Sequence, residues 1–383
     1  MNNFIIYGQP IIEQPEIDEV IDSMQKSWLG TGPKVSQFEL DFAKYKSIPY
    51  SAALNSCTAG LHLSCKVLNL QPGDEVITTA MTFCATVNAI IHAGATPVLA
   101  DIDELSWNID PKDIERKITP NTKAIIPVHF AGRACDMDSI MNIANKYNLS
   151  IIEDCAHAIE TEYKGKKAGT FGDFGVFSFY ATKNIVTGEG GMVISNNLDN
   201  ISKIKMLGLH GMSKDAWKRF SDEGYKHYLV EEAGYKYNMM DIQAAIGIHQ
   251  LKKIEEYSLK RERIWNLYLD EFKNLPIEMA AQVEKDTRHA YHLFIIRVNK
   301  NKSGLSRDTF LTEMTKKNIG VGVHYQAIPI HPFYQKTYGW KPEEYPNAVK
   351  FGQETVSIPL SAKLNENEIE RIIKSVKEVL NGQ

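Results

Sequence analysis

The sequence of 383 residues has ordinary globular proportions, with 43% hydrophobic and 23% charged residues. Its 43 Lys and Arg residues against 47 Asp and Glu residues give a net charge of −4 at pH 7. This balance leaves no basic footprint for nucleic acid, and the length favours a large α/β domain with a smaller appendage over one small core.

Neither the first residues nor the cysteines point to export. The N-terminal sequence lacks the basic stretch and long apolar core of a secretory signal. No apolar run approaches the roughly 20 residues that a membrane-spanning helix requires. The five cysteines are odd in number and form no CxxC pair, which argues against a disulfide framework or a zinc knuckle. We therefore expect a cytoplasmic protein that binds neither membrane nor nucleic acid.

From about residue 35 to residue 205, short apolar runs alternate with helical patterns. The predicted strands are 50–54, 75–78, 97–100, 123–128 and 150–153, and the predicted helices among them are 59–68, 85–92 and 137–147. Such alternation is typical of a mostly parallel sheet with helices on both faces. In these sheets, ligands bind beyond the carboxyl ends of the strands.

The pattern changes after residue 240. The predicted elements are a long helix at 241–274, a strand at 291–298, a helix at 307–317, a strand at 321–324 and an amphipathic helix at 366–380. We place a domain boundary near residue 250, with a large domain over 1–250 and a small α+β domain over 251–383. Between residues 212 and 234 lies a polar segment too long for a simple connection, and such loops tend to carry function.

The first candidate site in chain order is the turn at 55–60, between a predicted strand and a predicted helix. Its small residues expose backbone N–H groups, and the hydroxyls of Ser56 and Thr58 add donors, which suits a phosphate. The same residues could also form an ordinary helix N-cap. Phe83 begins the next helix, where it could stack on a flat ring or belong to the core.

Acidic residues follow two later strands. Asp101 and Asp103 could form the metal-binding motif of a glycosyltransferase, or merely end the strand at 97–100. Asp154 could pair with a protonated pyridine nitrogen, and His157 could pack on that ring or hydrogen-bond its oxygen. Alternatively, Asp154 caps the next turn and His157 is an ordinary buried histidine. No further cluster completes a metal site around them, so we expect no metal.

Lys183 stands in a polar turn between an aromatic-rich strand and a second strand at 192–195, which follows the glycine-rich stretch 188–191. A partly desolvated lysine loses its proton more easily than a surface lysine, and its free amine can form a Schiff base with an aldehyde. Ser178, near the end of the first strand, could face a phosphate. A phosphate turn, a stacking aromatic, a strand-end acid and a strand-end lysine together suit an aldehyde cofactor of the pyridoxal type.

These residues lie in motifs that resemble the DegT/StrS sugar aminotransferases over nearly the whole chain. The motifs are TAGLH at 58–62, EDCAH at 153–157, GDFG at 172–175, SFYATKN at 178–184, GEGG at 188–191 and GYKYN at 234–238. Segments 289–298 and 320–325 are most similar to the branch that makes UDP-4-amino-4-deoxy-L-arabinose. Two positions differ: Phe83 stands where that branch has tryptophan, and Ala181 where many relatives have proline.

The resemblance implies an α/β fold of pyridoxal 5'-phosphate (PLP)-dependent transferase fold type I, the aspartate-aminotransferase type, with a smaller α+β C-terminal domain. It also implies a homodimer with shared active sites, L-glutamate as amino donor and a nucleotide-linked keto-sugar as acceptor. The pathway would be surface polysaccharide, such as lipopolysaccharide, or deoxysugar biosynthesis. We expect amination at C4 of a UDP- or dTDP-linked sugar, with C3 of a dTDP-linked sugar as the alternative.

Residue roles follow from the same resemblance. Lys183 would carry the cofactor and shuttle the substrate proton, Asp154 would pair with the pyridine nitrogen, and His157 would contact the ring or its oxygen. The other implied contacts are stacking by Phe83, phosphate binding by Cys57, Thr58 and Ser178, an Asn238 that reaches in from the partner subunit, and a substrate-side His324.

Three rival classes fit the sequence less well. Relatives that dehydrate sugars have histidine in place of Lys183. A nicotinamide dehydrogenase would need GxGxxG after its first strand, whereas the glycines at 169, 172 and 175 have another spacing and come too late. A sensor that has lost its chemistry would have a degraded site, yet the lysine, the acid and the phosphate turn are all present.

Overall fold

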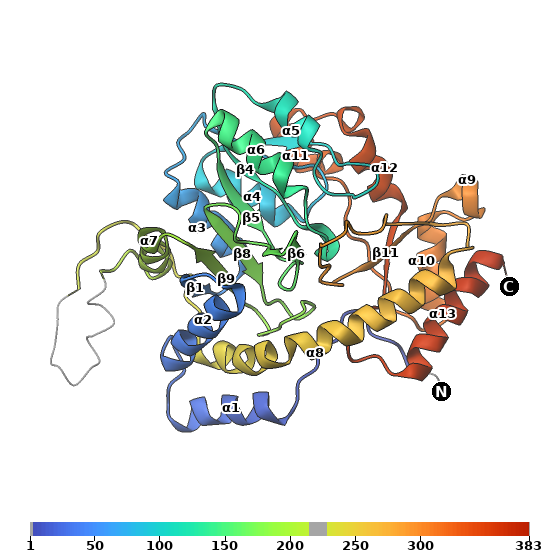
Figure 1. The fold of residues 1–383 in the computed structure, drawn as a ribbon, viewed down its shortest axis with the longest axis horizontal. Helices are drawn as coiled ribbons and strands as arrows, with labels where there is room; N and C mark the ends of the chain where they lie inside the picture. Colours follow the sequence, from blue (N-terminus) through green and yellow to red (C-terminus); the bar gives the residue numbers. More distant parts are fainter. Residues whose placement is uncertain (1–2, 214–227, 383) are drawn as a thin grey trace.

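A computed structural model describes residues 3–213 and 228–382 of the chain. A seven-stranded sheet forms the centre of its larger part (Figure 1). In spatial order the strands are β1 (Tyr50–Leu54), β9 (Gly191–Ser195), β8 (Phe174–Ser178), β5 (Ser150–Asp154), β4 (Thr122–Ile126), β2 (Glu75–Thr79) and β3 (Thr96–Ala100). Only β9 runs against its neighbours β1 and β8. The predicted α/β fold with a mostly parallel sheet is therefore confirmed.

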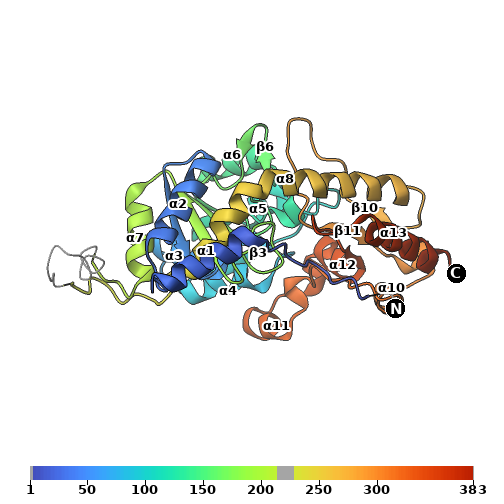
Figure 2. The ribbon, with the colours of Figure 1, turned by 90° about the horizontal axis from the view of Figure 1, so that it is seen from below.

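Helices cover both faces of this sheet (Figures 1 and 2). One face packs against α3 (Cys57–Val67), α4 (Cys84–Ala93) and α7 (Leu198–Gly208). The other packs against α2 (Pro33–Lys46), α5 (Pro111–Lys117), α6 (Met137–Tyr147) and α8 (Asp241–Phe272). Neighbouring residues of one strand, such as Ile151 and Ile152, join the cores on opposite faces. The central strands are continuous apolar runs because both faces are buried.

The smaller part is built on a three-stranded antiparallel sheet with a core of its own. Its elements are β10 (Glu278–Met279), β11 (Phe294–Arg297), β12 (Thr355–Ile358), α9 (Lys300–Ser303), α10 (Arg307–Lys316) and α13 (Glu366–Asn381). Both ends of the described chain lie here, beside α13 (Figures 1 and 2). Ile5 forms a bridge with Ile319, which brings the first strand-like residues to this part.

The long helix α8 runs from the larger part into the smaller one (Figure 1). The predicted domain boundary near residue 250 lies inside this helix. We propose that the small domain begins within α8 and includes the first residues of the chain. The remaining elements are α1 (Gln14–Gln25), which packs on α8, β6 (Glu162–Tyr163), β7 (Lys166–Lys167), α11 (Pro332–Tyr338), α12 (Pro346–Glu354) and the short 3-10 helices η1 (Phe130–Gly132), η3 (Ile328–Ile330) and η4 (Pro342–Glu344).

The strand predicted at 321–324 is wrong. Only Gly322 pairs there, in one isolated bridge to Ser357. Gly320 instead donates its N–H to Ile5 O, so the segment is divided between two partners and forms no continuous ladder. His324 and Tyr325, at its end, line a cavity.

The predicted functional loop at 212–234 lies only partly within the described structure. Its two ends are joined by a bridge between Met212 and Val230 and by a hydrogen bond from Ser213 N–H to Leu229 O. Residues 214–227 of this loop lie outside the described residues. Among the helices that the structure describes, none is both long enough and apolar enough to cross a membrane.

Candidate active site

A cavity of about 530 Å³ opens at the carboxyl ends of β1, β2, β5 and β8. It brings together eight of the nine predicted site residues: Cys57, Thr58, Phe83, Asp154, His157, Ser178, Lys183 and His324. These residues span almost 270 positions of sequence. The carboxyl ends of the parallel strands converge at one sheet edge and bring most of them together, and His324 is added from the C-terminal part of the chain.

The predicted phosphate turn forms the first turn of α3. Ser56 is the N-cap, and its Oγ accepts a hydrogen bond from Ala59 N–H at 3.1 Å. The N-cap alternative therefore holds for Ser56, whereas Cys57 and Thr58 line the cavity with the free N–H groups of a helix start. Gly191 of β9 lies against this turn, since a Cβ there would stand 2.4 Å from the backbone of Ser56. The turn and the strand can approach this closely only with glycine at that position.

Asp154 is a buried acid on the cavity wall, with only 4% of its surface exposed. Its Oδ2 accepts a hydrogen bond from Thr86 Oγ1 at 2.9 Å, and its Oδ1 accepts one from Ala156 N–H at 3.1 Å. The predicted turn-capping role is thus met by one oxygen only. Burial raises the pKa of Asp154, although these hydrogen bonds and Lys183 oppose the shift. No described cation forms an ion pair with it, so the site favours a ligand that brings positive charge.

His157 is buried beside Asp154 and carries a defined tautomer. Its Nδ1 accepts a hydrogen bond from Ala131 N–H at 3.2 Å, so the ring proton is on Nε2, 3.0 Å from the Tyr325 hydroxyl. Burial, followed by Lys183 and His292, lowers the pKa of His157 well below its usual value. The imidazole is therefore neutral and presents an N–H donor beside the cavity.

Lys183 lies in the turn that follows β8, closed by a hydrogen bond from its own N–H to Tyr180 O at 2.8 Å. Its side chain lines the cavity, and no described group forms a hydrogen bond or ion pair with its Nζ. Burial lowers the pKa of Lys183 to about 8, although Cys57 and Asp154 oppose the shift. An amine with this pKa is uncharged in about a tenth of the molecules at pH 7, far more than an ordinary lysine, and only the uncharged form is a nucleophile.

Phe83 and His324 also line the cavity. Phe83 is the N-cap residue of α4 and is 57% exposed, with its ring 5.7 Å from that of Tyr325. Large exposed aromatics on a cavity wall are suited to contact a ligand rather than to fill a core. His324 Nδ1 lies 2.9 Å from Ser357 Oγ, and burial lowers the pKa of His324 to about 4.

Asn238 is the one predicted site residue outside this cavity. It pairs with Leu54 in an isolated bridge, and its Nδ2 donates to Thr31 Oγ1 at 2.7 Å. It lines a separate hollow near Trp28 and Lys205. Within one chain, Asn238 therefore does not contact the other predicted residues.

Thr86 and Tyr325 line the cavity but were not predicted. Thr86 lies three positions after Phe83. Because residues three apart at the start of a helix share a face, this spacing is a signal that could have identified Thr86. Tyr325 directly follows His324, but its contact with His157 spans 168 positions, and no local pattern announces it.

The acidic pair of the glycosyltransferase alternative has a structural role. Asp101 accepts hydrogen bonds from the backbone N–H groups of Asn347 and Ala348 at the start of α12. Asp103 accepts from the N–H groups of Leu105 and Ser106. Both carboxylates are thus occupied by backbone donors, which supports the reading that they end a strand.

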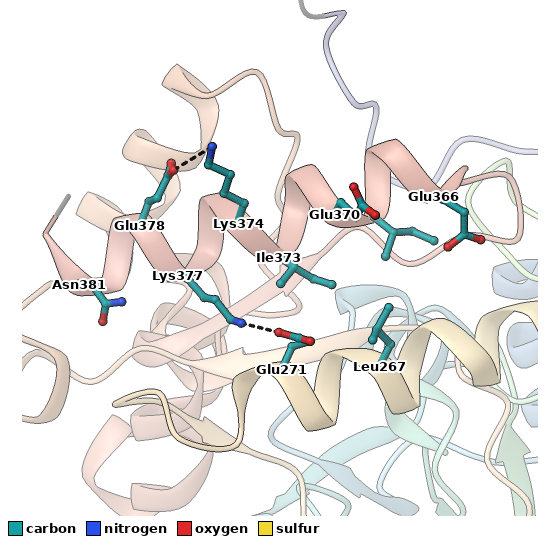
Figure 3. A pocket seen from close by; sticks show the side chains of 10 residues that line it. Leu267, Glu271, Glu366, Glu370, Ile373, Lys374, Lys377, Glu378 and Asn381 are labelled. Carbon is teal, nitrogen blue, oxygen red and sulfur yellow. Dashed lines mark hydrogen bonds and ion pairs between the residues drawn. The ribbon is translucent and has the colours of Figure 1, made fainter.

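Another hollow lies between α8 and α13, away from the predicted residues (Figure 3). Both of its lysines pair with glutamates of the hollow, Lys377 with Glu271 and Lys374 with Glu378 (Figure 3). The buried group His129, Glu153 and Cys155 could in principle hold a metal. However, Glu153 already accepts from His129 and from the N–H groups of three residues at 169–172. Neither place contains any of the predicted site residues.

The chain matches the DegT/DnrJ/EryC1/StrS aminotransferase family over residues 10–377. The spore coat polysaccharide biosynthesis protein SpsC of Bacillus subtilis is 45% identical over 382 residues, which cover 100% of this chain and 98% of that protein. An uncharacterized protein of Methanocaldococcus jannaschii is 48% identical over 378 residues, 99% of this chain and 98% of that one.

Solved structures show the same likeness. A Streptococcus pneumoniae protein described as a sugar aminotransferase, Spr1654, has a TM-score of 0.92 in its PMP form, with 34% identity over 99% of both chains. Its PLP form has a TM-score of 0.91. Helicobacter pylori PseC, an aminotransferase involved in the biosynthesis of pseudoaminic acid, has a TM-score of 0.91 with 29% identity over 100% of both chains.

Proposed function

Because this chain belongs to the DegT/DnrJ/EryC1/StrS aminotransferase family, we propose that it transfers the amino group of L-glutamate to a nucleotide-linked keto-sugar. It is a PLP-dependent sugar aminotransferase, a transaminase. We propose C4 of a UDP- or dTDP-linked 4-keto-sugar as the aminated carbon. One observation carries the proposal: an unpaired buried acid, Asp154, and a desolvated lysine, Lys183, line the same cavity.

The residues of the cavity fit the cofactor. When bound, PLP supplies an aldehyde and a cationic pyridine ring that takes up electrons from a substrate C–H bond. Asp154 would pair with the cationic ring. This pairing would stabilise the ionised carboxylate and so oppose the rise in pKa that burial causes. Cys57 and Thr58, at the start of α3, would bind the phosphate together with Ser178, since a helix N-terminus favours anions.

The remaining side chains would orient the ring and move a proton. Lys183 would hold the cofactor through its ε-amine and, once released, carry the proton to and from the substrate carbon. His157 would donate its Nε2–H beside the ring, and Phe83 would stack on the exposed face. His324, which also lines the cavity, would contact the substrate.

The partner contacts follow the family. We propose a homodimer in which Asn238 completes the site of the other subunit, since Asn238 lies outside the cavity of its own chain. The names of SpsC and PseC refer to a spore coat polysaccharide and to pseudoaminic acid, which supports a role in surface polysaccharide synthesis. The closer similarity to the 4-amino-arabinose branch stays a prediction.

Absorption spectra test the role of Lys183. Protein purified with PLP should be yellow, and glutamate should bleach the band. Lys183→Ala should fold normally, lack the band, and lose turnover by about 10⁴-fold or more, because the covalent attachment and the proton carrier disappear together. Lys166→Ala, at an exposed position of the short strand β7, is the control and should behave as the unaltered protein. Amination by Lys183→Ala at the original rate would refute the proposal.

A substrate panel tests the chemistry of the acceptor. UDP- and dTDP-linked 3-keto- and 4-keto-sugars would each be incubated with glutamate, and products identified by mass and NMR. We expect an amine at C4. An amine at C3 of a dTDP-linked sugar would favour the alternative, and no amine on any sugar would contradict the acceptor class.

A further inference from the structure

The side-chain amide of Asn184, the residue after the lysine, forms hydrogen bonds through both its nitrogen and its oxygen. Its Nδ2 donates to both carboxylate oxygens of Glu160, at 3.0 and 2.9 Å, and to Ala290 O at 2.9 Å. An amide oxygen can only accept, so His292 Nδ1–H donates to Asn184 Oδ1 at 3.0 Å. Three segments distant in sequence thus meet at one side chain next to Lys183.

The strongest of these partners is itself fixed. Glu160 is 2% exposed and forms an ion pair with Arg261 of α8, which is 4% exposed. Burial raises the pKa of Glu160, whereas Arg261 and then Asn184 oppose the shift. A buried acid needs both a counter-charge and hydrogen bonds, so Asn184 is tied to the middle of a long helix.

The network also reaches the other side of the site. His292 donates its Nδ1–H to Asn184, which fixes its tautomer, and its ring centre lies 4.5 Å from that of His157. Through His292, the network around Asn184 therefore also contacts the histidine that follows Asp154.

Lys183 lines a second, smaller hollow besides the main cavity. This hollow of about 40 Å³ adjoins the turn, and Lys183, Asn184, Arg261 and His292 are among its lining residues. A turn free to rotate would let the amine leave the main cavity.

We propose that Asn184 is the positioning residue of Lys183: anchored by Glu160, Ala290 O and His292, it holds the lysine turn toward the main cavity. This inference rests on the proposed role of Lys183 and is independent of which sugar is aminated. Asn184 does not line the main cavity and acts only through its neighbour.

Competitive labelling of the full-length protein freed of cofactor tests this directly. Trace acetic anhydride at a series of pH values, read by mass spectrometry on the peptide that carries Lys183, gives the pKa and reactivity of that amine. In Asn184→Ala we expect water to reach the loosened turn and the pKa of Lys183 to rise by about one unit. Labelling at pH 8 then falls about fivefold, as the neutral fraction drops.

A matched control separates positioning from general loosening. In the smaller part, Asn299 donates to the buried Glu354, which pairs with Arg297, so the arrangement repeats that of Asn184, Glu160 and Arg261. Asn299→Ala should lower the melting temperature about as much as Asn184→Ala but leave the labelling of Lys183 unchanged. An equal shift of the labelling profile in both variants would overturn the proposal.

An exchange of partners tests the contact itself. Asn184→Asp sets a second carboxylate against Glu160, so we expect further disturbance of Lys183 labelling. Adding Glu160→Gln restores one amide and one acid, and should return the profile toward that of the unaltered protein. An unaltered profile in Asn184→Ala, or no rescue in the double variant, would overturn the proposal. Because labelling needs neither cofactor nor turnover, failure here leaves the proposed function standing.

Discussion

Asp154 carries a charge that no described side chain pairs with, which makes its replacement informative. In Asp154→Asn the bound cofactor loses its counter-charge, and we expect PLP affinity to fall by about 3 kcal/mol, roughly a hundredfold. The cofactor-free variant should be at least as stable as the unaltered protein at pH 7. The pKa of Asp154 is higher in the folded protein than in the unfolded chain. Above the unfolded-state pKa, the ionised carboxylate therefore lowers the stability of the folded state, and Asn avoids this cost.

Cofactor titration and thermal melts measure these two effects. Asp103→Asn is the control, because Asp103 also follows a strand but accepts hydrogen bonds only from the N–H groups of Leu105 and Ser106 and from the Ser106 hydroxyl. Unchanged PLP affinity in Asp154→Asn would remove Asp154 from its proposed role.

The pKa of Lys183 predicts how cofactor uptake depends on pH. Only the uncharged amine attacks an aldehyde, and burial lowers the pKa of Lys183 to about 8. The rate of PLP uptake by cofactor-free protein should therefore rise about tenfold per unit below pH 8 and level off above it. Stopped-flow absorbance between pH 6 and pH 9.5 measures this profile. A rate that keeps rising to the end of the range would indicate an ordinary, solvated lysine.

Residue types and their positions after strands were enough to predict most of this site. Lys183, Asp154 and Thr58 each follow a predicted strand, and strand ends converge in a parallel sheet. The partners of these residues were not predictable in the same way. Thr86 meets Asp154 across 68 positions, and Tyr325 meets His157 across 168, so only the packed fold sets these contacts.

At the scale of elements, the junction of β9 with α3 tests whether the phosphate turn depends on close packing. A Cβ on Gly191 would stand 2.4 to 2.5 Å from the backbone of Ser56 and Cys57, and backbone cannot yield as a flexible side chain can. We expect Gly191→Ala to lower the free energy of unfolding by about 2 kcal/mol or more. PLP affinity should fall as well, because the start of α3 is displaced.

Denaturant unfolding measures the change in stability, and PLP titration measures the change in cofactor affinity. Gly30→Ala is the matched control, since a Cβ there meets nothing within 4 Å. A variant at Gly191 that keeps full stability would show that the strand and the turn can separate without cost.

Elements with a strong local pattern were predicted well, and those that depend on distant partners were not. The helix predicted at 137–147 matches α6 (Met137–Tyr147), which Asp136 caps and whose apolar face is buried. The strand predicted at 321–324 is wrong because its backbone pairs only at Gly322, with Ser357, while the preceding Gly320 bonds to Ile5. An apolar run in the sequence does not show where such distant partners lie. Helices α1 and α2 were not predicted. In α1, several apolar side chains are exposed within one chain, so its pattern does not mark a single buried face.

At the scale of the whole molecule, that exposed surface and the position of Asn238 belong to the same question. Ile12, Ile17, Ile21, Met24, Trp28 and Leu29 are exposed at and around α1. Trp28 and Asn238 line the same hollow, apart from the cavity of their own chain. A homodimer with shared sites would use both features, and it makes a prediction that no single variant can test.

Mixed dimers of two impaired variants distinguish shared sites from separate ones. Lys183→Ala lacks the lysine, and Asn238→Ala should retain PLP poorly. If Asn238 serves the partner's site, a mixed dimer has one site with both changes and one site with neither. After random exchange about half of the dimers are mixed, so activity should recover to about a quarter of the unaltered value. This holds at PLP concentrations that leave Asn238→Ala alone mostly empty. If Asn238 served its own chain, every site would carry one change, and mixing would give no more activity than Asn238→Ala contributes by itself.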